Sequence, residues 1–290
     1  MVPVSIITPS FQKGRFIERT IQSVLDQAAA GMEYVVVDGG STDQTVEVLK
    51  RYDSRIRWLS EKDDGQADAV NKGIRMTRGE IIGWLNADDI YYPGAISTVL
   101  AYFKKHPEVD IVYGDADHID EDDQVLEPYY TEDWDYERLK DICFICQPAV
   151  FFRRRLVERI GLLDRNLQYC MDYEYWLRAG RTTDFVRLNQ KLAGSRMYDD
   201  NKTLGERLPV HKEINRMFKQ RFRRIPDKWL FAYAHVFTEE MGFDRTIHRE
   251  NIKFILVLVC ALFGSCMRWR QPISMHALKT AANWLAGIYR

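Results

Sequence analysis

A short polar segment that follows an apolar one offers the clearest chemistry in the sequence. In GWLNADDIYYPG, residues 83–94, Asn86, Asp88 and Asp89 come directly after the apolar run GEIIGWL. Adjacent carboxylates repel each other, so a pair at the end of a buried strand needs a positive charge close by. Mg²⁺ and Mn²⁺ prefer oxygen ligands and combine one or two carboxylates with phosphate oxygens of a substrate. We therefore expect Asp88 and Asp89 to bind Mn²⁺ or Mg²⁺ together with a diphosphate. For Asp89 alone, capping of the next helix is the alternative.

The elements that must position these residues alternate between strands and helices. The apolar runs VSIIT, EYVVVD, RIRWLS and EIIGWL are each followed by a helical pattern. This alternation predicts an α/β fold with a mostly parallel sheet. Ligands bind beyond the carboxyl ends of the strands in such sheets. Asp38, Asp63 with Asp64, and Asp88 with Asp89 each follow a strand, so we expect the three acidic clusters to meet in one crevice.

Beyond the first hundred residues the pattern changes. DIVYGDADHIDEDDQVLEPYY indicates a hairpin with an acidic turn, QPAVFFRRRLVERIGLLD a strand that leads into a helix, and MDYEYWLRAG the start of a helix. After about Leu192 the alternation ends. Residues 1–200 hold 25 Lys and Arg against 35 Asp and Glu, a charge of −10, whereas residues 201–290 hold 16 against 7, a charge of +9. The two parts therefore face different partners, or each other.

Composition narrows the class of protein further. A chain of 290 residues with 46% hydrophobic residues is long enough for a substantial core, and its net charge of −1 argues against a nucleic-acid partner. The five cysteines are an odd number and scattered, and MVPVSIITPSF opens with a strand pattern rather than a signal peptide. We expect reduced thiols and a cytoplasmic location. Cys143 and Cys146 have the spacing of a metal or redox pair, but without further ligands they are predicted to be buried thiols.

Six segments in order resemble the successive motifs of family 2 glycosyltransferases of the bacterial surface-glycan type. They are VSIITPSFQKGRFIERTIQSVLDQ, EYVVVDGGSTDQT, DDGQADAVNKGI, GEIIGWLNADD, QPAVFFRR and MDYEYWLRAG, and the resemblance covers roughly residues 3–200. It implies the GT-A fold and an inverting hexosyl- or N-acetylhexosaminyltransferase. The donor would be a nucleotide-diphosphate sugar, with UDP expected, and the acceptor a hydroxyl of a glycan or a lipid-linked oligosaccharide in cell-surface polysaccharide synthesis.

The resemblance also implies roles for individual residues. Asp38 would accept a hydrogen bond from uracil N3–H, and Phe11 would offer its ring to the base. Asn86 stands where the family's DxD motif has its first Asp, which leaves Asp88 as the main metal ligand and Asp89 as a second. The nucleotide-binding residues implied are Thr8, Pro9, Ser10, Phe11, Asp38, Asp64, Gln66, Asp68, Lys72, Asn86, Ala87 and Arg196.

For Asp172 and for the pair Asp68 and Lys72, a structural role is the alternative to the role that the resemblance implies. Asp172 falls on the family's catalytic base, which takes the proton of the acceptor hydroxyl; capping of its helix is the alternative, and Glu174 is the second candidate for the base. Val70 stands where family members often carry Arg, and Lys72 would supply the missing charge. Asp68 and Lys72 are also four residues apart on one helix, so a simple salt bridge is the alternative.

The domain organisation follows from these assignments. We expect a catalytic domain over residues 1–200, with a nucleotide-binding half at 1–105 and an acceptor half at 106–200, and a helical region at 201–290. Phe254 to Met267 is a run of 14 residues without a charge, shorter than the roughly 20 that a spanning helix needs. With its basic flanks it predicts peripheral contact with the inner face of the plasma membrane through residues 207–290. A helix packed within the protein is the alternative.

Three other functions are alternatives to a glycosyltransferase. A non-catalytic nucleotide-sugar-binding relative would explain the departures at Asn86 and Val70. A sugar nucleotidyltransferase would need a Gly-rich loop with Arg or Lys after the first strand, and TPSFQKGRF has one Gly. An NAD-dependent dehydrogenase would need a GxGxxG motif after a strand, which the sequence lacks.

Overall fold

The chain divides into two compact units. The structure, a computed structural model, describes residues 3–199, 201, 205–243 and 251–286. One unit comprises Met1–Leu139 and Cys143–Tyr198, and is here called the sheet unit. The other comprises Lys140–Ile142 and Asp199–Arg290, and is called the helical unit.

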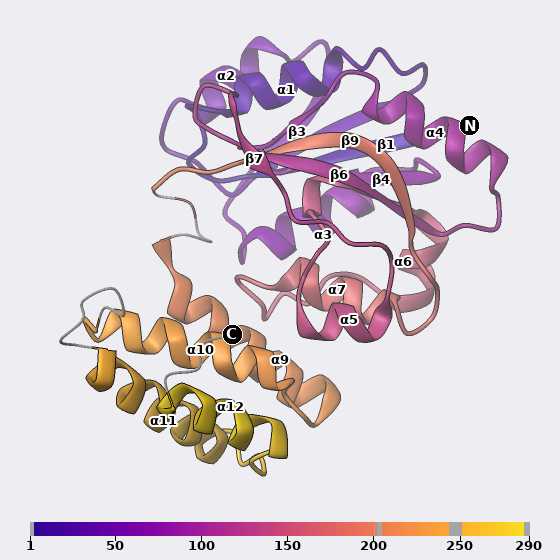
Figure 1. The fold of residues 1–290 in the computed structure, drawn as a ribbon. Helices are drawn as coiled ribbons and strands as arrows, with labels where there is room; N and C mark the ends of the chain where they lie inside the picture. The colour runs from indigo at the N-terminus through magenta and orange to yellow at the C-terminus, as the bar shows by residue number, and fades with distance from the viewer. Residues whose placement is uncertain (1–2, 200, 202–204, 244–250, 287–290) are drawn as a thin grey trace. The chain divides into compact units, whose positions relative to one another are not determined.

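The sheet unit is built on one mixed sheet (Figure 1). Among the described residues, nine strands form it in the order β3-β2-β1-β4-β8-β6-β9-β5, with β7 paired to β6. The four strands β3, β2, β1 and β4 run parallel, β8 runs antiparallel to both β4 and β6, and β6 and β9 run parallel. The predicted α/β class is confirmed. The strands are β1 (Val4–Ser10), β2 (Glu33–Asp38), β3 (Arg57–Ser60), β4 (Ile81–Trp84), β5 (Ile90–Tyr91), β6 (Ile111–Ile119), β7 (Val125–Pro128), β8 (Val150–Arg153) and β9 (Val186–Arg196).

Helices connect the strands and cover the sheet. A Cβ atom at Gly73 would lie 2.3 Å from Cγ2 of Ile7, so only glycine lets the third helix approach the first strand this closely. The helices are α1 (Ile17–Leu25), α2 (Thr45–Arg51), α3 (Gln66–Met76), α4 (Ala95–Lys105), α5 (Tyr136–Asp141), α6 (Arg154–Ile160), α7 (Met171–Ala179) and the short 3₁₀ helix η1 (Gln147–Ala149).

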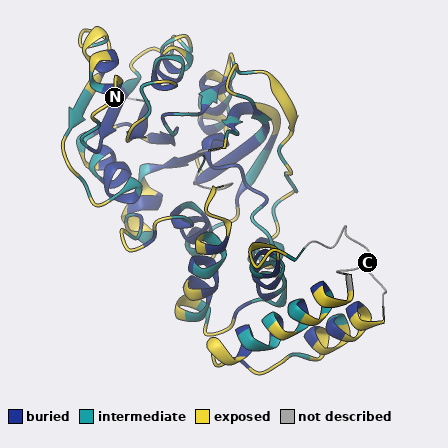
Figure 2. Cartoon of the chain, turned by 90° about the vertical axis from the view of Figure 1, so that its left-hand side faces the viewer, coloured by how far each residue is buried: buried dark blue, intermediate teal, exposed yellow. Residues whose placement is uncertain are grey.

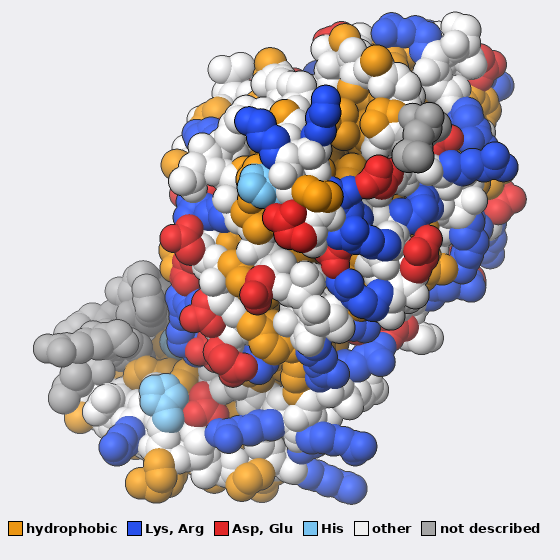
Figure 3. Space-filling model, turned by 90° about the vertical axis from the view of Figure 1, so that its right-hand side faces the viewer, with side chains coloured by type: hydrophobic (Ala, Val, Ile, Leu, Met, Phe, Trp, Pro, Cys, Tyr) orange, Lys and Arg blue, Asp and Glu red, His pale blue; other side chains and the backbone are white. Residues whose placement is uncertain are grey.

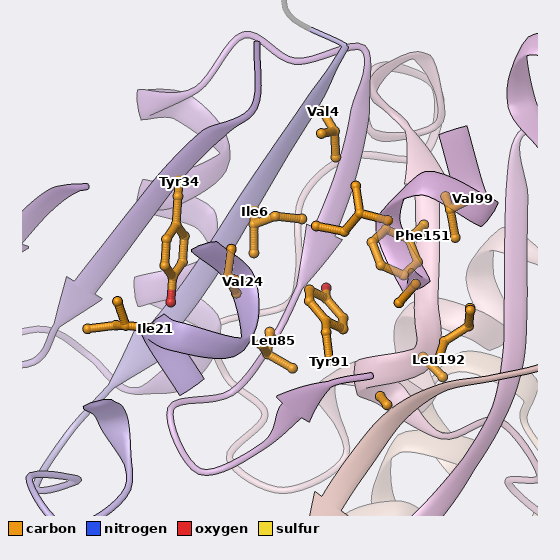
Figure 4. Packing of buried hydrophobic residues seen from close by; sticks show 14 of the residues in the cluster. Val4, Ile6, Ile21, Val24, Tyr34, Leu85, Tyr91, Val99, Phe151 and Leu192 are labelled. Atoms are coloured by element: carbon orange, nitrogen blue, oxygen red, sulfur yellow. The ribbon is translucent and has the colours of Figure 1, made fainter. Parts of the chain in front are cut away.

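The core of the sheet unit explains why the first strands are almost continuously apolar. All seven residues of β1 are buried, because helices lie against both faces of the sheet (Figure 2). Ile6 and Val4 of β1 pack in one cluster with Val24 of α1 and Phe151 of β8 (Figure 4). Tyr91 stacks on Phe151 with a centroid separation of 5.3 Å. This packing holds the strand ends, and the loops after them, in fixed places.

Among its described residues, the helical unit contains four long helices, α9 (Arg207–Phe222), α10 (Asp227–Glu240), α11 (Asn251–Arg268) and α12 (Met275–Leu285). The run Phe254 to Met267 lies within α11, where Phe254, Leu258 and Leu262 form a buried stripe. Leu256 and Met267 on the same helix are exposed. No helix among the described residues combines the length and apolar character that crossing a membrane requires.

Candidate active site

The loop after β4 is organised by the Asn86 side chain. Its Oδ1 accepts hydrogen bonds from Gln66 Nε2 at 2.7 Å and from Trp84 Nε1 at 2.9 Å. Its Nδ2 donates to Asp89 Oδ2 at 3.1 Å. The amide therefore joins β4, α3 and the second carboxylate of the pair. The contact with Gln66 brings together two residues that the sequence places in the nucleotide site.

Asp89 is the inner carboxylate of the pair and is almost fully buried. Its Oδ1 accepts a hydrogen bond from the Arg196 backbone N–H at 2.9 Å. Burial raises the pKa of the Asp89 carboxyl, and the charge of Asp88 raises it further. The capping alternative for Asp89 is wrong, because α4 begins at Ala95 after Gly94 and has no side-chain cap.

Asp88 is the outer carboxylate and meets a cation and a hydroxyl group. Its Oδ2 lies 3.0 Å from Lys13 Nζ and accepts a hydrogen bond from Tyr198 Oη at 2.5 Å. Lys13 Nζ also hydrogen-bonds Tyr198 Oη, and the Tyr198 ring packs on Phe16 at 4.9 Å between centroids. Oδ1 of Asp88 has no hydrogen-bond or ion-pair partner among the described residues. This oxygen is therefore available to a ligand.

The donor set fits a divalent cation that takes most of its ligands from a substrate. No group of three or more His, Cys, Asp or Glu side chains with metal-binding geometry occurs among the described residues. Asp88 supplies one carboxylate at the end of a buried strand, and Asp89 lies behind it. Mg²⁺ and Mn²⁺ sites that bind substrate phosphates commonly use one or two carboxylates and keep several waters. The arrangement thus fits a hard cation shared with a diphosphate.

Arg196, which the resemblance places among the nucleotide-binding residues, contacts other parts of the protein. Its side chain is fully buried. Nε donates to the Asp88 carbonyl oxygen at 2.7 Å, Nη1 donates to the Asp120 carbonyl oxygen at 2.8 Å, and the guanidinium pairs with Asp123. The residue ties the loop of Asp88 to the tip of the β6–β7 hairpin. In this conformation the guanidinium faces protein groups rather than a pocket.

The ends of β1 and β2 present mainly buried polar groups. Thr8 Oγ1 shares a hydrogen bond of 3.1 Å with Tyr34 Oη, and Pro9 beside it is also buried. The Ser10 hydroxyl is buried without a hydrogen-bond partner among the described residues. Phe11 is 58% exposed, so its ring is free to stack on a planar group. An unpartnered hydroxyl beside an open aromatic ring is what a nucleoside site would offer.

Asp38 already has several partners within the protein. Its carboxylate accepts hydrogen bonds from Ser41 N at 2.8 Å, Ser41 Oγ at 2.5 Å, Ser60 Oγ at 2.7 Å and Gly40 N at 3.1 Å. It therefore shapes the loop after β2 and links it to β3. At the start of the next helix, α2, Asp43 Oδ1 accepts a hydrogen bond from Thr45 N at 3.0 Å. Binding of uracil by Asp38 stays a prediction.

Asp63 and Asp64, which follow β3, have different partners. Asp64 is 75% exposed at its side chain and pairs with Arg165. Asp63 instead faces the loop after β2, where its Oδ2 would lie 3.0 Å from a Cβ atom at Gly39. Burial raises the pKa of the Asp63 carboxyl despite the hydrogen bond from Gly65 N–H. Asp63 thus faces the loop after β2, and binding of the nucleotide by Asp64 stays a prediction.

Lys72 and Asp68 form ion pairs within the protein. Lys72 Nζ lies 2.8 Å from Glu61 Oε1 and 3.5 Å from Asp68 Oδ2. Arg165 Nε approaches the other Asp68 oxygen at 3.1 Å. The salt-bridge alternative for Asp68 and Lys72 is therefore present. Arg165 brings a second cation to this acidic cluster from nearly a hundred residues further along the chain.

Asp172 lies in the first turn of α7. Its Oδ1 accepts a hydrogen bond from Tyr173 N at 2.8 Å. Burial raises the pKa of the Cys146 thiol, and the charges of Asp89 and Asp172 raise it further. The role of Asp172 as the base stays a prediction. Glu174, the second candidate for the base, is buried and pairs with Arg178 at 2.9 Å.

Several contributors to the site were missed by sequence reasoning. Lys13 and Tyr198 contact Asp88 from positions far apart in the chain, and the sequence gives no signal for that meeting. Gln147, within the motif QPAVFF, donates to the Trp84 carbonyl oxygen at 2.6 Å, and its own Oε1 is buried without a hydrogen-bond partner among the described residues. Its place in a quoted motif is the signal that could have identified it.

Comparison with known proteins decides the family. Residues 5–161, more than half of the chain, match the family model described as Glycosyl transferase family 2. The chain belongs to glycosyltransferase family 2. The family 2 assignment agrees with the acidic loop after β4 and with the order of the sequence motifs.

Curated relatives of this family 2 chain include polysaccharide synthases. It is 30% identical over 215 residues to an uncharacterized glycosyltransferase of Rickettsia typhi, a match covering 69% of this chain and 65% of that protein. It is 28% identical over 215 residues to chondroitin synthase of Escherichia coli, covering 72% of this chain and 31% of that protein. The chain thus spans less than two thirds of the length of these relatives.

Solved structures show that this family 2 chain shares the GT-A glycosyltransferase fold. Residues 1–349 of TarS from S. aureus in complex with UDP-GlcNAc align with a TM-score of 0.61 at 15% identity, over 90% of this chain and 81% of that one. The mannosyltransferase PcManGT from Pyrobaculum calidifontis, in complex with GDP-Man and Mn²⁺, aligns with a TM-score of 0.60 at 17% identity, over 99% of this chain and 81% of that one. At such low identity the likeness concerns the fold.

Proposed function

We propose that this chain is a metal-dependent inverting glycosyltransferase that moves a hexosyl or N-acetylhexosaminyl group from a UDP-sugar to a hydroxyl group. The observation that carries the proposal is the free Oδ1 of Asp88 at the end of β4, with Asp89 buried behind it. The UDP-GlcNAc bound to TarS and the Mn²⁺ in the PcManGT complex support the donor and the cation by analogy.

The roles of the residues follow from their chemistry. Asp88, with Asp89 behind it, would hold Mn²⁺ or Mg²⁺, which when bound neutralises charge on the leaving diphosphate. Phe11 offers its ring to the base, and the unpartnered Ser10 hydroxyl offers a donor. Asp172 takes the proton of the acceptor hydroxyl as that oxygen attacks the anomeric carbon opposite the leaving group. Attack from that side inverts the configuration of the sugar.

We place the acceptor among glycans and lipid-linked oligosaccharides of the cell surface. The relatives named chondroitin synthase and O-antigen biosynthesis protein support polysaccharide synthesis as the setting. Contact of residues 207–290 with the inner face of the plasma membrane would bring the enzyme to a lipid-linked acceptor. The charge of +9 over residues 201–290 supports that contact.

Calorimetric titration of the full chain tests the proposal. UDP, GDP and dTDP are each titrated with Mn²⁺ and with EDTA, and the series is repeated with Asp88→Ala. We expect UDP to bind only with the metal, and the variant to lose that binding. Asp26→Ala, which removes an exposed carboxylate in the same unit, is the matched control and should bind like the wild type. Absence of nucleotide binding with metal would refute the proposal.

A second candidate, a non-catalytic nucleotide-sugar-binding protein, is favoured by one observation. Asn86 replaces an acidic residue of the family motif, and its amide serves Trp84, Gln66 and Asp89 within the protein. Hydrolysis of UDP-sugars in the presence of Mn²⁺ separates the two candidates. A non-catalytic protein would bind the nucleotide but would release UDP from UDP-sugars no faster than the Asp172→Asn variant does.

A further inference from the structure

The helical unit contains a basic pocket of its own. The pocket has a volume of about 300 Å³. Lys219, Arg223 and Arg224, at the end of α9, line one side, and residues 271–274, between α11 and α12, line the other. Three cations thus meet the short connection that leads into α12.

Hydrogen bonds hold the two walls of this pocket together. The buried Gln271 side chain accepts from Ile225 N at 2.7 Å and donates to Ile225 O at 2.8 Å. Lys219 Nζ donates to the Arg270 carbonyl oxygen at 3.2 Å. Ser274 hydrogen-bonds Asp227 and accepts from Ala277 N at 2.9 Å, which caps α12. The pocket is therefore formed without a ligand, so a ligand would not have to order it.

The positive charge in the pocket is not neutralised by the protein. Across residues 205–243 and 251–286, Arg223 and Arg224 have no carboxylate partner, and both are exposed. Asp227, close by in the chain, is engaged by the Ser274 hydroxyl. Residues 251–290 contain five Lys and Arg and no Asp or Glu. The charged residues that line the pocket are all cations, and Asp227 lies behind Ser274 rather than in the lining.

Apolar side chains are exposed directly beside these cations. Ile273 lines the pocket and is 43% exposed. On α12, Met275, Leu278 and Leu285 are 69%, 43% and 55% exposed, whereas Ala277, Ala281 and Trp284 on the other side of the helix are buried. Successive steps of three and seven residues, from Met275 to Leu278 and from Leu278 to Leu285, place the exposed apolar residues on one face of the helix. Hydrophobic and basic side chains also lie next to each other at the lower end of the molecule in Figure 3.

We propose that the cations of the pocket and the exposed apolar residues beside them together bind an anionic phospholipid bilayer. This surface consists of Lys219, Arg223, Arg224, Ile273, Met275 and Leu278. A lipid phosphate would enter the basic pocket, and the apolar side chains would enter the boundary between headgroups and acyl chains. Interfacial helices combine these two features, an apolar face and flanking cations. A nucleic acid would use the cations but leave the apolar stripe in water. The inference deepens the membrane contact proposed above and depends on it.

Sedimentation of the full chain with vesicles tests this surface. Vesicles of phosphatidylcholine alone are compared with vesicles in which about a third of the lipid is phosphatidylglycerol. We expect binding to the anionic vesicles only. The double variant Arg223→Glu with Arg224→Glu should weaken that binding more than about tenfold, because each cation near the surface contributes to the attraction. Met275→Asp with Leu278→Asp should weaken binding to a similar extent.

Matched controls make the outcome decisive. Lys104→Glu with Lys105→Glu changes the same charge at exposed positions of α4 and should bind vesicles like the wild type. Circular dichroism melts establish that each variant folds. The proposal is overturned if the wild type does not bind anionic vesicles, or if the control loses as much binding as the arginine variant. It is also overturned if the α12 variant changes only the oligomeric state in light scattering. UDP titration of the same variants shows whether the nucleotide site is intact, so failure of this inference is distinct from failure of the proposed function.

Discussion

The ammonium group of Lys13 contacts the same carboxylate that a divalent cation needs. Lys13 Nζ lies 3.0 Å from Asp88 Oδ2, and both side chains are less than a third exposed. Without metal, this contact and the Tyr198 hydroxyl satisfy one oxygen of Asp88. Lys13 therefore compensates the charge of Asp88 in part, whereas the pKa of Asp89 is still raised by burial and by the charge of Asp88.

Removal of this internal cation should strengthen metal binding. In Lys13→Met, we expect the affinity for Mn²⁺ in the absence of nucleotide to rise by a factor of about 1.4 to 5, since a partly exposed ion pair contributes about 0.2–1 kcal/mol. Titration of free Mn²⁺ by electron paramagnetic resonance measures it. Lys50→Met, at an exposed position of α2, should leave the affinity unchanged. An unchanged affinity in Lys13→Met would mean that Lys13 does not compete with the metal.

The role of Asp172 is tested by separating turnover from binding. Asp172→Asn should lower kcat by roughly 10²–10⁴-fold, the usual range for loss of a general base, and leave the UDP affinity close to that of the wild type. Glu174→Gln is the comparison, because Glu174 is paired with Arg178 and should affect folding stability more than chemistry. A larger loss of kcat in Glu174→Gln would assign the base to Glu174.

At the scale of elements, Arg196 joins three segments around the candidate active site. It contacts the loop of Asp88, the tip of the β6–β7 hairpin and, at 4.8 Å, the Phe16 ring before α1. Arg19 adds a second link to the hairpin through Asp123 at 3.2 Å. The hairpin tip is therefore held against the site by charged side chains rather than by the apolar core.

Loss of this link should cost stability. Arg196→Met removes a fully buried guanidinium and leaves carbonyl groups without donors, so we expect the free energy of unfolding to fall by about 2–4 kcal/mol. Urea denaturation measures the change. Arg51→Met, at a 58% exposed position paired with Glu18, should change it by less than about 0.5 kcal/mol. Equal effects of the two substitutions would contradict the role given to Arg196.

The loops after β1 and β2 are joined by Asp43, which makes their stability depend on pH. Burial raises the pKa of the Asp43 carboxyl, but hydrogen bonds from Thr45 and from Gly14 N–H outweigh it and lower the pKa below 3.8. A lowered pKa in the folded state means that the contribution is complete above 3.8 and is lost as the pH falls through the folded value. Asp43→Asn should therefore flatten the decline of stability in acid, as measured by urea denaturation between pH 5 and about pH 2. If the free energy of unfolding falls equally steeply with pH in Asp43→Asn and in the wild type, Asp43 does not contribute to the pH dependence.

Local patterns predicted the elements, whereas long-range contacts decided the site. The parallel strands were predicted because apolar runs followed by helical spacing are encoded in neighbouring residues. The different partners of Asp63 and Asp64 were not predicted, because consecutive residues in a turn point in different directions. The burial of Arg196 at the end of β9 depends on pairing between β6 and β9, and the meeting of Lys13 with Asp88 depends on pairing between β1 and β4. No local pattern encodes either pairing.

At the scale of the whole molecule, two separate cores support two separate unfolding steps. Phe218 is fully buried in the helical unit and Phe152 in the sheet unit. A chain with two units departs from two-state behaviour. Phe218→Ala should lower the midpoint of one urea transition, and Phe152→Ala that of the other, with a loss of about 3–5 kcal/mol in each case. Tryptophan fluorescence and far-ultraviolet circular dichroism follow the transitions. A single transition moved equally by both substitutions would indicate one cooperative unit.

The path of the chain limits how the protein can be shortened. Residues Lys140–Ile142 belong to the helical unit although sheet-unit residues flank them on both sides. The Trp229 indole donates to the Lys140 carbonyl oxygen at 2.9 Å. The chain passes between the two units three times, after residues 139, 142 and 198. A truncation after Tyr198 would remove the rest of the helical unit, and the end of α5 would lose its neighbours there. Gene fusions or domain exchanges that treat residues 199–290 as a removable tail would carry that defect.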